Sequence, residues 1–229
     1  EAGLVAVQLH GDETPEYCRS LRGLTTIKAL RVGADYNVES AAAYGTDAVP
    51  RSPVSLQELE LLKATLLLGE DDLAALRRSG DLLAPRVEEI LDVWYGFVGA
   101  NPHLLAAFSN AQGQPDQDYL AAVRRRFGRW ILDTARADYD QAWLDYQHEI
   151  GRRHTREGKN RTDGAKAADH IPLRYVLALL VPITTTLKPF LAKGGAAPEE
   201  VEAMHAAWVK AVLLQVILWS QPYVRDGDF

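Results

Sequence analysis

Apolar residues recur at helical spacing from residue 53 onward, and they predict a series of separate helices. The segment Ser55-Leu-Gln-Glu58 has the form of a capping box, in which the serine hydroxyl accepts from one orphan amide and the glutamate accepts from another. A helix beginning near Glu70 has acidic residues suited to its positive N-terminus, and Pro85 breaks or restarts the pattern. Further helices are predicted over residues 87–100, 119–134, 139–154, 171–193 and 198–219.

Residues 1–52 have short apolar runs without a sustained period. We predict that they form an N-terminal extension of loop with one or two short helices, before a single domain at 53–229. Neither an alternating strand pattern nor an Asn-Gly hairpin is found in the sequence. Six or more helices with short connections predict an all-α fold.

Composition narrows the class of protein. Hydrophobic residues make up 47% of the 229 residues and charged residues 24%, which is typical of a globular protein with a sizeable core. The net charge of −6, without a block of like charges, argues against a nucleic-acid partner. The longest apolar stretch contains Arg174, Pro182 and Lys188, which argues against a membrane span. Cys18 is the one cysteine, so no internal disulfide can form, and we expect a cytoplasmic protein.

The histidines are the remaining candidates for chemistry, because phosphate loops, zinc motifs and nucleophile elbows are absent from the sequence. Trp143, Gln147, Ile150 and His154 are spaced 4, 3 and 4 residues apart, so His154 lies on the apolar face of its helix near the C-terminal end. His148 lies about 240° further around that helix. A histidine on an apolar face is more often a core residue than a ligand. A haem iron, however, requires a neutral imidazole in such a dry site.

Long motifs along the chain resemble those of the protoglobins, in the same order, from about residue 53 to the C-terminus. The resemblance implies an expanded three-over-three globin fold that binds haem b. It also implies reversible binding of O2, CO and NO, and a homodimer packed through the last two long helices. The motifs are Asp92-Val-Trp-Tyr-Gly-Phe-Val-Gly99, Tyr119-Leu-Ala-Ala-Val-Arg-Arg-Arg-Phe-Gly-Arg-Trp130, Tyr139-Asp-Gln-Ala-Trp-Leu-Asp-Tyr146, His170-Ile-Pro-Leu-Arg-Tyr175, Thr186-Leu-Lys-Pro-Phe-Leu-Ala-Lys193 and Leu214-Gln-Val-Ile-Leu-Trp-Ser220.

The same resemblance implies a set of haem-binding residues. His154 corresponds to the proximal iron ligand, and Thr155 stands where relatives often have a second histidine. Trp94 and Tyr95 correspond to the distal aromatic pair. The predicted set is completed by Phe127 over the iron, Phe108 packed on the haem, Arg126 as a propionate partner, and the apolar residues Ile150, Leu179 and Ile183.

Two departures from the family pattern predict a roomier distal side. Leu179 stands where relatives have a bulky aromatic residue, and Ala106-Ala107 replace an aromatic pair. The leading hypothesis is a haem protein that senses, stores or scavenges diatomic gases. A haem enzyme with NO dioxygenase or peroxidase-like activity is the first alternative, although the distal motif offers Tyr95 rather than a histidine and arginine pair. A haem-free globin-like interaction module is the second.

Overall fold

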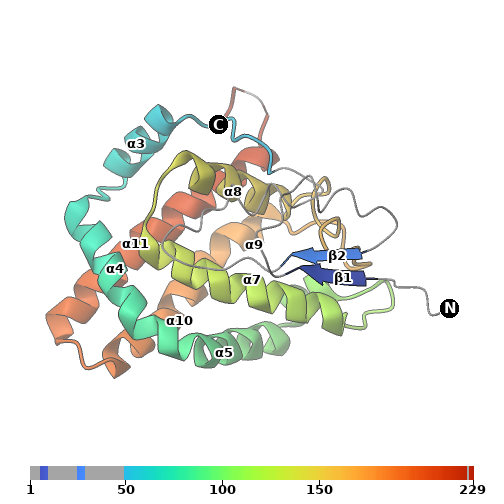
Figure 1. The fold of residues 1–229 in the computed structure, drawn as a ribbon, viewed down its shortest axis with the longest axis horizontal. Coiled ribbons are helices and arrows are strands. Elements are labelled where there is room, and N and C mark those ends of the chain that lie inside the picture. Colours follow the sequence, from blue (N-terminus) through green and yellow to red (C-terminus); the bar gives the residue numbers. More distant parts are fainter. Residues whose placement is uncertain (1–5, 10–24, 29–48, 226) are drawn as a thin grey trace. The chain divides into compact units, whose positions relative to one another are not determined.

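The computed structural model describes residues 6–9, 25–28, 49–225 and 227–229, and the chain divides into two compact units, 1–50 and 51–229 (Figure 1). In the first unit, strands β1 (Ala6–Leu9) and β2 (Thr25–Lys28) pair in parallel, with Ala6 opposite Thr25. The prediction of loop and short helices is therefore wrong for these two segments. Their β-branched residue types favour extended backbone, and runs of four residues are too short to show alternation.

The first half of the helical unit follows the caps and breaks of the sequence. The Ser55 capping box is confirmed, since the amide of Glu58 lies 3.2 Å from the serine hydroxyl and the amide of Ser55 lies 2.7 Å from the Glu58 carboxylate. Pro85 lies in a 3-10 turn that separates two helices. The elements are α3 (Leu56–Thr65), α4 (Glu70–Leu83), η1 (Ala84–Arg86), α5 (Val87–Ala100), α6 (Pro102–Leu105) and η2 (Ala106–Phe108).

The second half contains the longest helices and one break that the sequence pattern did not predict. The single helix expected over 171–193 is interrupted at Leu179. Pro182 lacks the amide that would bond to the carbonyl of Ala178, which accounts for a break at this point. The elements are α7 (Gln117–Arg136), α8 (Gln141–Arg152), α9 (Leu173–Ala178), α10 (Leu180–Lys193), α11 (Pro198–Ser220) and η3 (Gln221–Tyr223).

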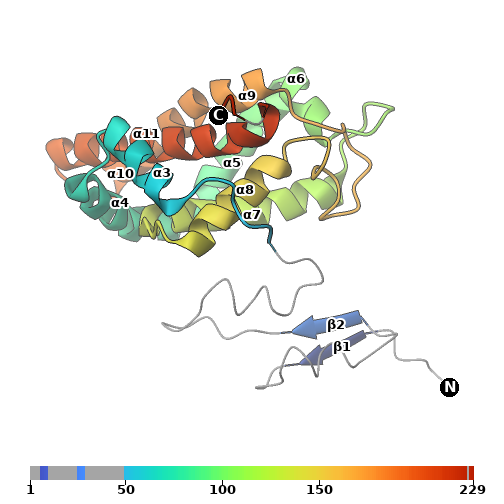
Figure 2. The ribbon, with the colours of Figure 1, turned by 90° about the horizontal axis from the view of Figure 1, so that it is seen from above.

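Helix α11 is the centre of the helical unit, because it packs against α10, α4 and α8. Helix α7 contacts α4 and α5. Figure 2 shows α7 and α8 on one side of the unit and α9, α10 and α11 on the other. The prediction of an all-α, globin-like fold is confirmed for the helical unit.

Two segments, Leu173–Lys193 and Pro198–Tyr223, are long and apolar enough to cross a membrane by length and composition alone. A helix in the interior of a globular domain meets the same test, because it needs apolar side chains on every face. Helix α11 has buried residues along its whole length, which accounts for its composition. The other segment is the interrupted pair α9 and α10.

Two tryptophans of α11 lie inside the chain's own core. Trp208 is 0% exposed and Trp219 is 7% exposed. Both side chains are therefore used inside the chain and offer little surface to a second copy. The indole of Trp208 donates to the Ser79 hydroxyl at 2.8 Å, and that hydroxyl donates to the carbonyl of Leu76 at 2.6 Å.

This buried hydrogen bond generates a prediction. Replacing Ser79 with Ala leaves the indole N–H of Trp208 without its acceptor, which should lower the free energy of unfolding by about 1–3 kcal/mol. Denaturant unfolding measures the loss, and Ser220→Ala, which removes only a bond to the carbonyl of Ile217, is the control. In a protein that already carries Trp208→Phe, Ser79→Ala should lower the free energy of unfolding by less. Additive costs would show that this bond does not contribute to stability.

Candidate functional site

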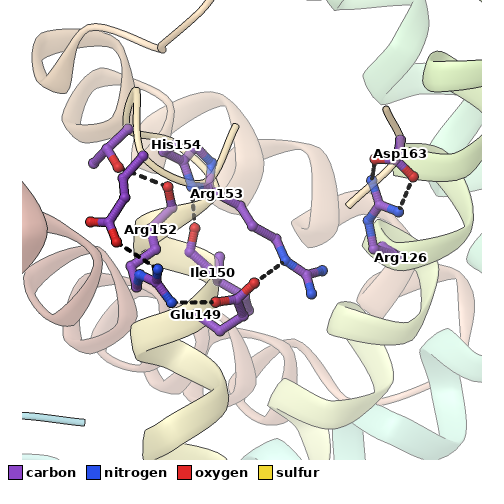
Figure 3. Close-up of polar contacts among 9 residues, drawn as sticks. Arg126, Glu149, Ile150, Arg152, Arg153, His154 and Asp163 are labelled. Atoms are coloured by element: carbon purple, nitrogen blue, oxygen red, sulfur yellow. Dashed lines mark hydrogen bonds and ion pairs between the residues drawn. The ribbon is translucent and has the colours of Figure 1, made fainter. Parts of the chain in front are cut away.

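His154 lies in the turn that follows α8, and a main-chain hydrogen bond fixes its imidazole. Its Nδ1 is 2.7 Å from the carbonyl oxygen of Ile150, one turn earlier (Figure 3). Because a carbonyl oxygen only accepts, Nδ1 must carry the proton and donate it. In the neutral ring, Nε2 therefore holds a lone pair.

The surroundings of His154 keep the ring neutral. Burial lowers its pKa, the hydrogen bond to Ile150 opposes that shift, and the positive charges of Lys159 and Arg153 add to it. The imidazole is consequently uncharged at neutral pH.

The other ring nitrogen is available to a ligand. Among the described residues, His154 Nε2 has no hydrogen-bond partner, and the enclosed polar atoms without one are Tyr139 Oη, His205 Nε2 and Gln221 Oε1. The residue as a whole is half-buried. A neutral, oriented imidazole with a free nitrogen fits the axial ligand of a haem iron.

Contacts from α11 and η3 hold the turn of His154 in place. The His154 carbonyl accepts from the amide of Ile171 at 2.8 Å, and the Tyr223 hydroxyl lies 3.0 Å from that carbonyl. Gly151 allows α8 to approach α11, since a Cβ there would lie 3.0 Å from Trp219 Cα. The Trp219 ring then stacks on the imidazole, with centroids 5.7 Å apart.

An unbroken series of aromatic rings connects His154 to the predicted distal residues. From Trp219 the next ring is Trp130, at 6.0 Å, and Phe127 stacks on Trp130 at 5.1 Å. Trp94, on α5, is 5.4 Å from Phe127. The structure thus places Trp94 and Phe127 together.

Tyr95 belongs to a second aromatic group. Its ring is 6.5 Å from Phe108, edge to face, and Phe108 is 5.7 Å from Tyr119. The guanidinium of Arg124 lies 5.8 Å from the Tyr95 ring centroid. Burial raises the pKa of Tyr95, and no hydrogen bond of its hydroxyl is found in the described part of the chain. The hydroxyl is therefore a protonated donor without a partner there.

The remaining predicted residues lie in three different settings. Ile183 is buried in α10, and the Ile150 side chain packs against the core. Leu179, at the break between α9 and α10, lines a groove of about 440 Å³. The guanidinium of Arg126 donates to both carboxylate oxygens of Asp163, at 2.8 and 2.6 Å (Figure 3). The other residues that line the groove are Phe97, His103, Leu104, Tyr175, Ala178, Val181, Pro182 and Thr185.

Sequence reasoning did not assign a site role to Trp219, Tyr223 or Lys159. The apolar spacing of α11 marked Trp219 as buried somewhere, but nothing local showed that it would stack on the imidazole. Tyr223 contacts the His154 turn from the far end of the chain, and Lys159 follows that turn without a recognisable motif. These contacts join segments that are distant in sequence, so no local signal could have identified them.

Comparisons with known proteins point to one family. The family described as Protoglobin matches residues 55–229. A segment is also similar to N-(5'-phosphoribosyl)anthranilate isomerase of Trichormus variabilis, at 50% identity over 48 residues, and to that of a Synechococcus species, at 51% over 47 residues. Each match covers 19% of this chain, and 23% and 21% of the two isomerases. The chain thus spans less than a quarter of these relatives, and the likeness is confined to a short segment.

Proposed function

The chain belongs to the protoglobin family, and from that premise we propose that it binds one haem b through His154 and takes up diatomic gases at the ferrous iron. The observation that carries the proposal is the Nδ1 hydrogen bond to Ile150, which leaves a neutral Nε2 without a partner among the described residues. Gas sensing, storage or scavenging in the cytoplasm is the role that we infer.

The protein's own residues would orient the cofactor and keep water away from it. When bound, the haem would supply a ferrous iron that takes up O2, CO or NO, and O2 would carry more negative charge there than CO. Trp94 and Phe127 supply apolar bulk and Tyr95 a hydroxyl donor. Because water is scarce beside these rings, a hydrogen bond there is stronger than in solution.

We predict that His154→Ala abolishes stable haem binding or the proximal ligation. His148→Ala is the matched control, because His148 lies on α8, just before the turn of His154, and is also half-buried. Absorption spectra of the ferrous and CO-bound proteins measure both variants. An unchanged Soret band in His154→Ala, with a changed band in His148→Ala, would contradict the assignment of the proximal ligand.

Among the side chains of the predicted distal side, we propose Tyr95 as the hydrogen-bond donor to a bound gas. Phe127 and Leu179 have no polar side-chain atoms, so they contribute only bulk. Burial raises the pKa of Tyr95, so its hydroxyl keeps its proton at neutral pH. The indole of Trp94 is the next available donor.

We expect Tyr95→Phe to speed O2 release by about 2- to 13-fold, which corresponds to the loss of one neutral hydrogen bond of about 0.5–1.5 kcal/mol. CO release should change much less, because CO gains little charge. Stopped-flow measurement of both gases on the same variant tests this. Equal changes for both gases, or none for O2, would leave Tyr95 with a packing role only.

We also propose a homodimer through the last two long helices. Leu177 and Val181, 48% and 66% exposed, are apolar side chains on the outer face of α9 and α10. On α11, Ala203 and Ala206 are exposed and small, so they would allow close approach of a second copy. These residues, rather than Trp208 and Trp219, are the support for this interface.

A charge at the proposed interface should separate the subunits. Val181→Lys places an ammonium where the second copy would exclude water, so the dimer dissociation constant should rise at least about tenfold. Val93→Lys, at a side chain 51% exposed on α5, is the control and should leave association unchanged. Light scattering over a range of concentrations gives both values. A wild-type protein with the mass of one chain at micromolar concentration would rule the dimer out.

A further inference from the structure

Lys159 is a buried cation that makes no ion-pair contact with a carboxylate of the described residues. It is 4% exposed. Its Nζ donates to the carbonyl of Ala107 at 2.8 Å, lies 3.4 Å from Asn160 Oδ1, and is 4.8 Å from the Tyr119 ring centroid. No carboxylate oxygen of a described residue forms an ion pair with it, although several other basic side chains there have one.

Such an arrangement is unfavourable by itself. Removing an ammonium from water carries a large desolvation cost, which an anion normally offsets. One carbonyl and one aromatic face offset only part of it. Burial lowers the pKa of Lys159 to about 8, although the charges of Asp169 and Asp163 oppose that shift, so the side chain is still mostly charged at neutral pH.

The place of this ammonium relates it to the proposed haem site. Lys159 lies five residues after His154, in the segment that follows the proximal turn. Its acceptor, Ala107, immediately precedes Phe108, and Tyr119 packs on Phe108 at 5.7 Å. The charge therefore joins the segment that carries the proximal ligand to the segment that carries a predicted haem-packing residue.

Arg126 differs from Lys159 in this respect. Both of its terminal nitrogens already bond to Asp163, in a bidentate pair that balances the charge of the guanidinium. An additional anion at Arg126 would lie beside the Asp163 carboxylate and be repelled by its charge. Lys159 would lose only a neutral carbonyl bond.

We propose that Lys159 pairs with a propionate carboxylate of the haem, while Arg126 stays paired with Asp163 and orders the loop. The proposal rests on the proposed function, since it needs haem in the pocket. The carboxylate would replace the Ala107 carbonyl as the partner of Nζ and neutralise the buried charge. A free carboxylate ion offers the same chemistry, so the experiment must separate the two sources.

The test compares haem with its dimethyl ester, which has no carboxylates. Release of each from the ferric protein to an excess of a haem-scavenging apoprotein is followed by absorbance. Lys159→Met should speed the loss of haem by about ten- to a hundred-fold, as expected for one charge-assisted hydrogen bond, and should leave the loss of the ester within about twofold of wild type. Lys159→Arg should restore most of the difference. Lys166→Met, at an exposed position in the same loop, should change neither rate.

The outcomes separate this proposal from the proposed function. Equal acceleration for haem and ester would give Lys159 a structural role only, and an unchanged haem rate would remove it from the site; either result overturns the proposal. Arg126→Met should accelerate the loss of both cofactors equally, and an effect of Arg126→Met on haem alone would overturn the assignment in favour of Arg126. A wild-type protein that takes up neither cofactor would overturn both proposals.

A final measurement tests whether a free carboxylate ion, rather than haem, pairs with Lys159. Thermal unfolding of the haem-free wild type is compared with and without sodium propionate, beside Lys159→Met and Lys159→Arg. Stabilisation that requires Lys159, together with no difference between haem and ester, would assign the site to a free carboxylate and overturn the proposal. Native-like unfolding of Lys159→Arg, with no effect of propionate, supports pairing that depends on the haem.

Discussion

The hydrogen bond from His154 Nδ1 to the Ile150 carbonyl is the constraint on which the proposed site depends. It fixes the tautomer and the orientation of the ring, so the lone pair is on Nε2. The bond exists because α8 ends two residues before His154 and leaves the carbonyl of Ile150 within reach. Tyr223 and the amide of Ile171 then hold the turn through the His154 carbonyl. The chemistry of one side chain is thus set by how a helix ends.

The aromatic core around this histidine requires polar atoms of its own. Three of the five buried indoles donate to a side chain: Trp208 to Ser79, Trp219 to Gln147, and Trp130 to Gln215. A donor left unpaired there would cost about 1–3 kcal/mol, so these hydrogen bonds favour one arrangement of the rings. The same rings lead from His154 to Phe127 and Trp94. The packing of the core therefore also sets the relative positions of these site residues.

The charges of Arg126 and Lys159, both near the proposed haem site, are balanced in different ways. Arg126 has a carboxylate in the chain and is satisfied by it. Lys159 has a carbonyl and a ring, which offset less of the desolvation cost. We connect this difference to the cofactor, because a propionate would bring an anion into direct contact with Nζ, a contact that Asp163 and Asp169 do not make. The family resemblance predicted Arg126 as the propionate partner, but in the structure Arg126 bonds to the carboxylate of Asp163.

The sequence alone determined the features that follow from local spacing. Helical period, the capping box at Ser55 and Pro85 indicated the helical fold. The spacing of Trp143, Gln147 and Ile150 singled out His154, although the structure places it in the turn after α8 rather than on the helix. The family motifs added the distal set, whose haem role remains a proposal. Only the tertiary structure decided that Trp208 and Trp219 are interior, that the 171–193 segment breaks at Leu179, and that two short N-terminal segments pair as strands. The physical reason is that period and caps are set by neighbours within one or two turns. Burial, ring stacking and the pairing of a charge depend on segments that meet only when the chain folds, as Lys159 meets Ala107 and Tyr119.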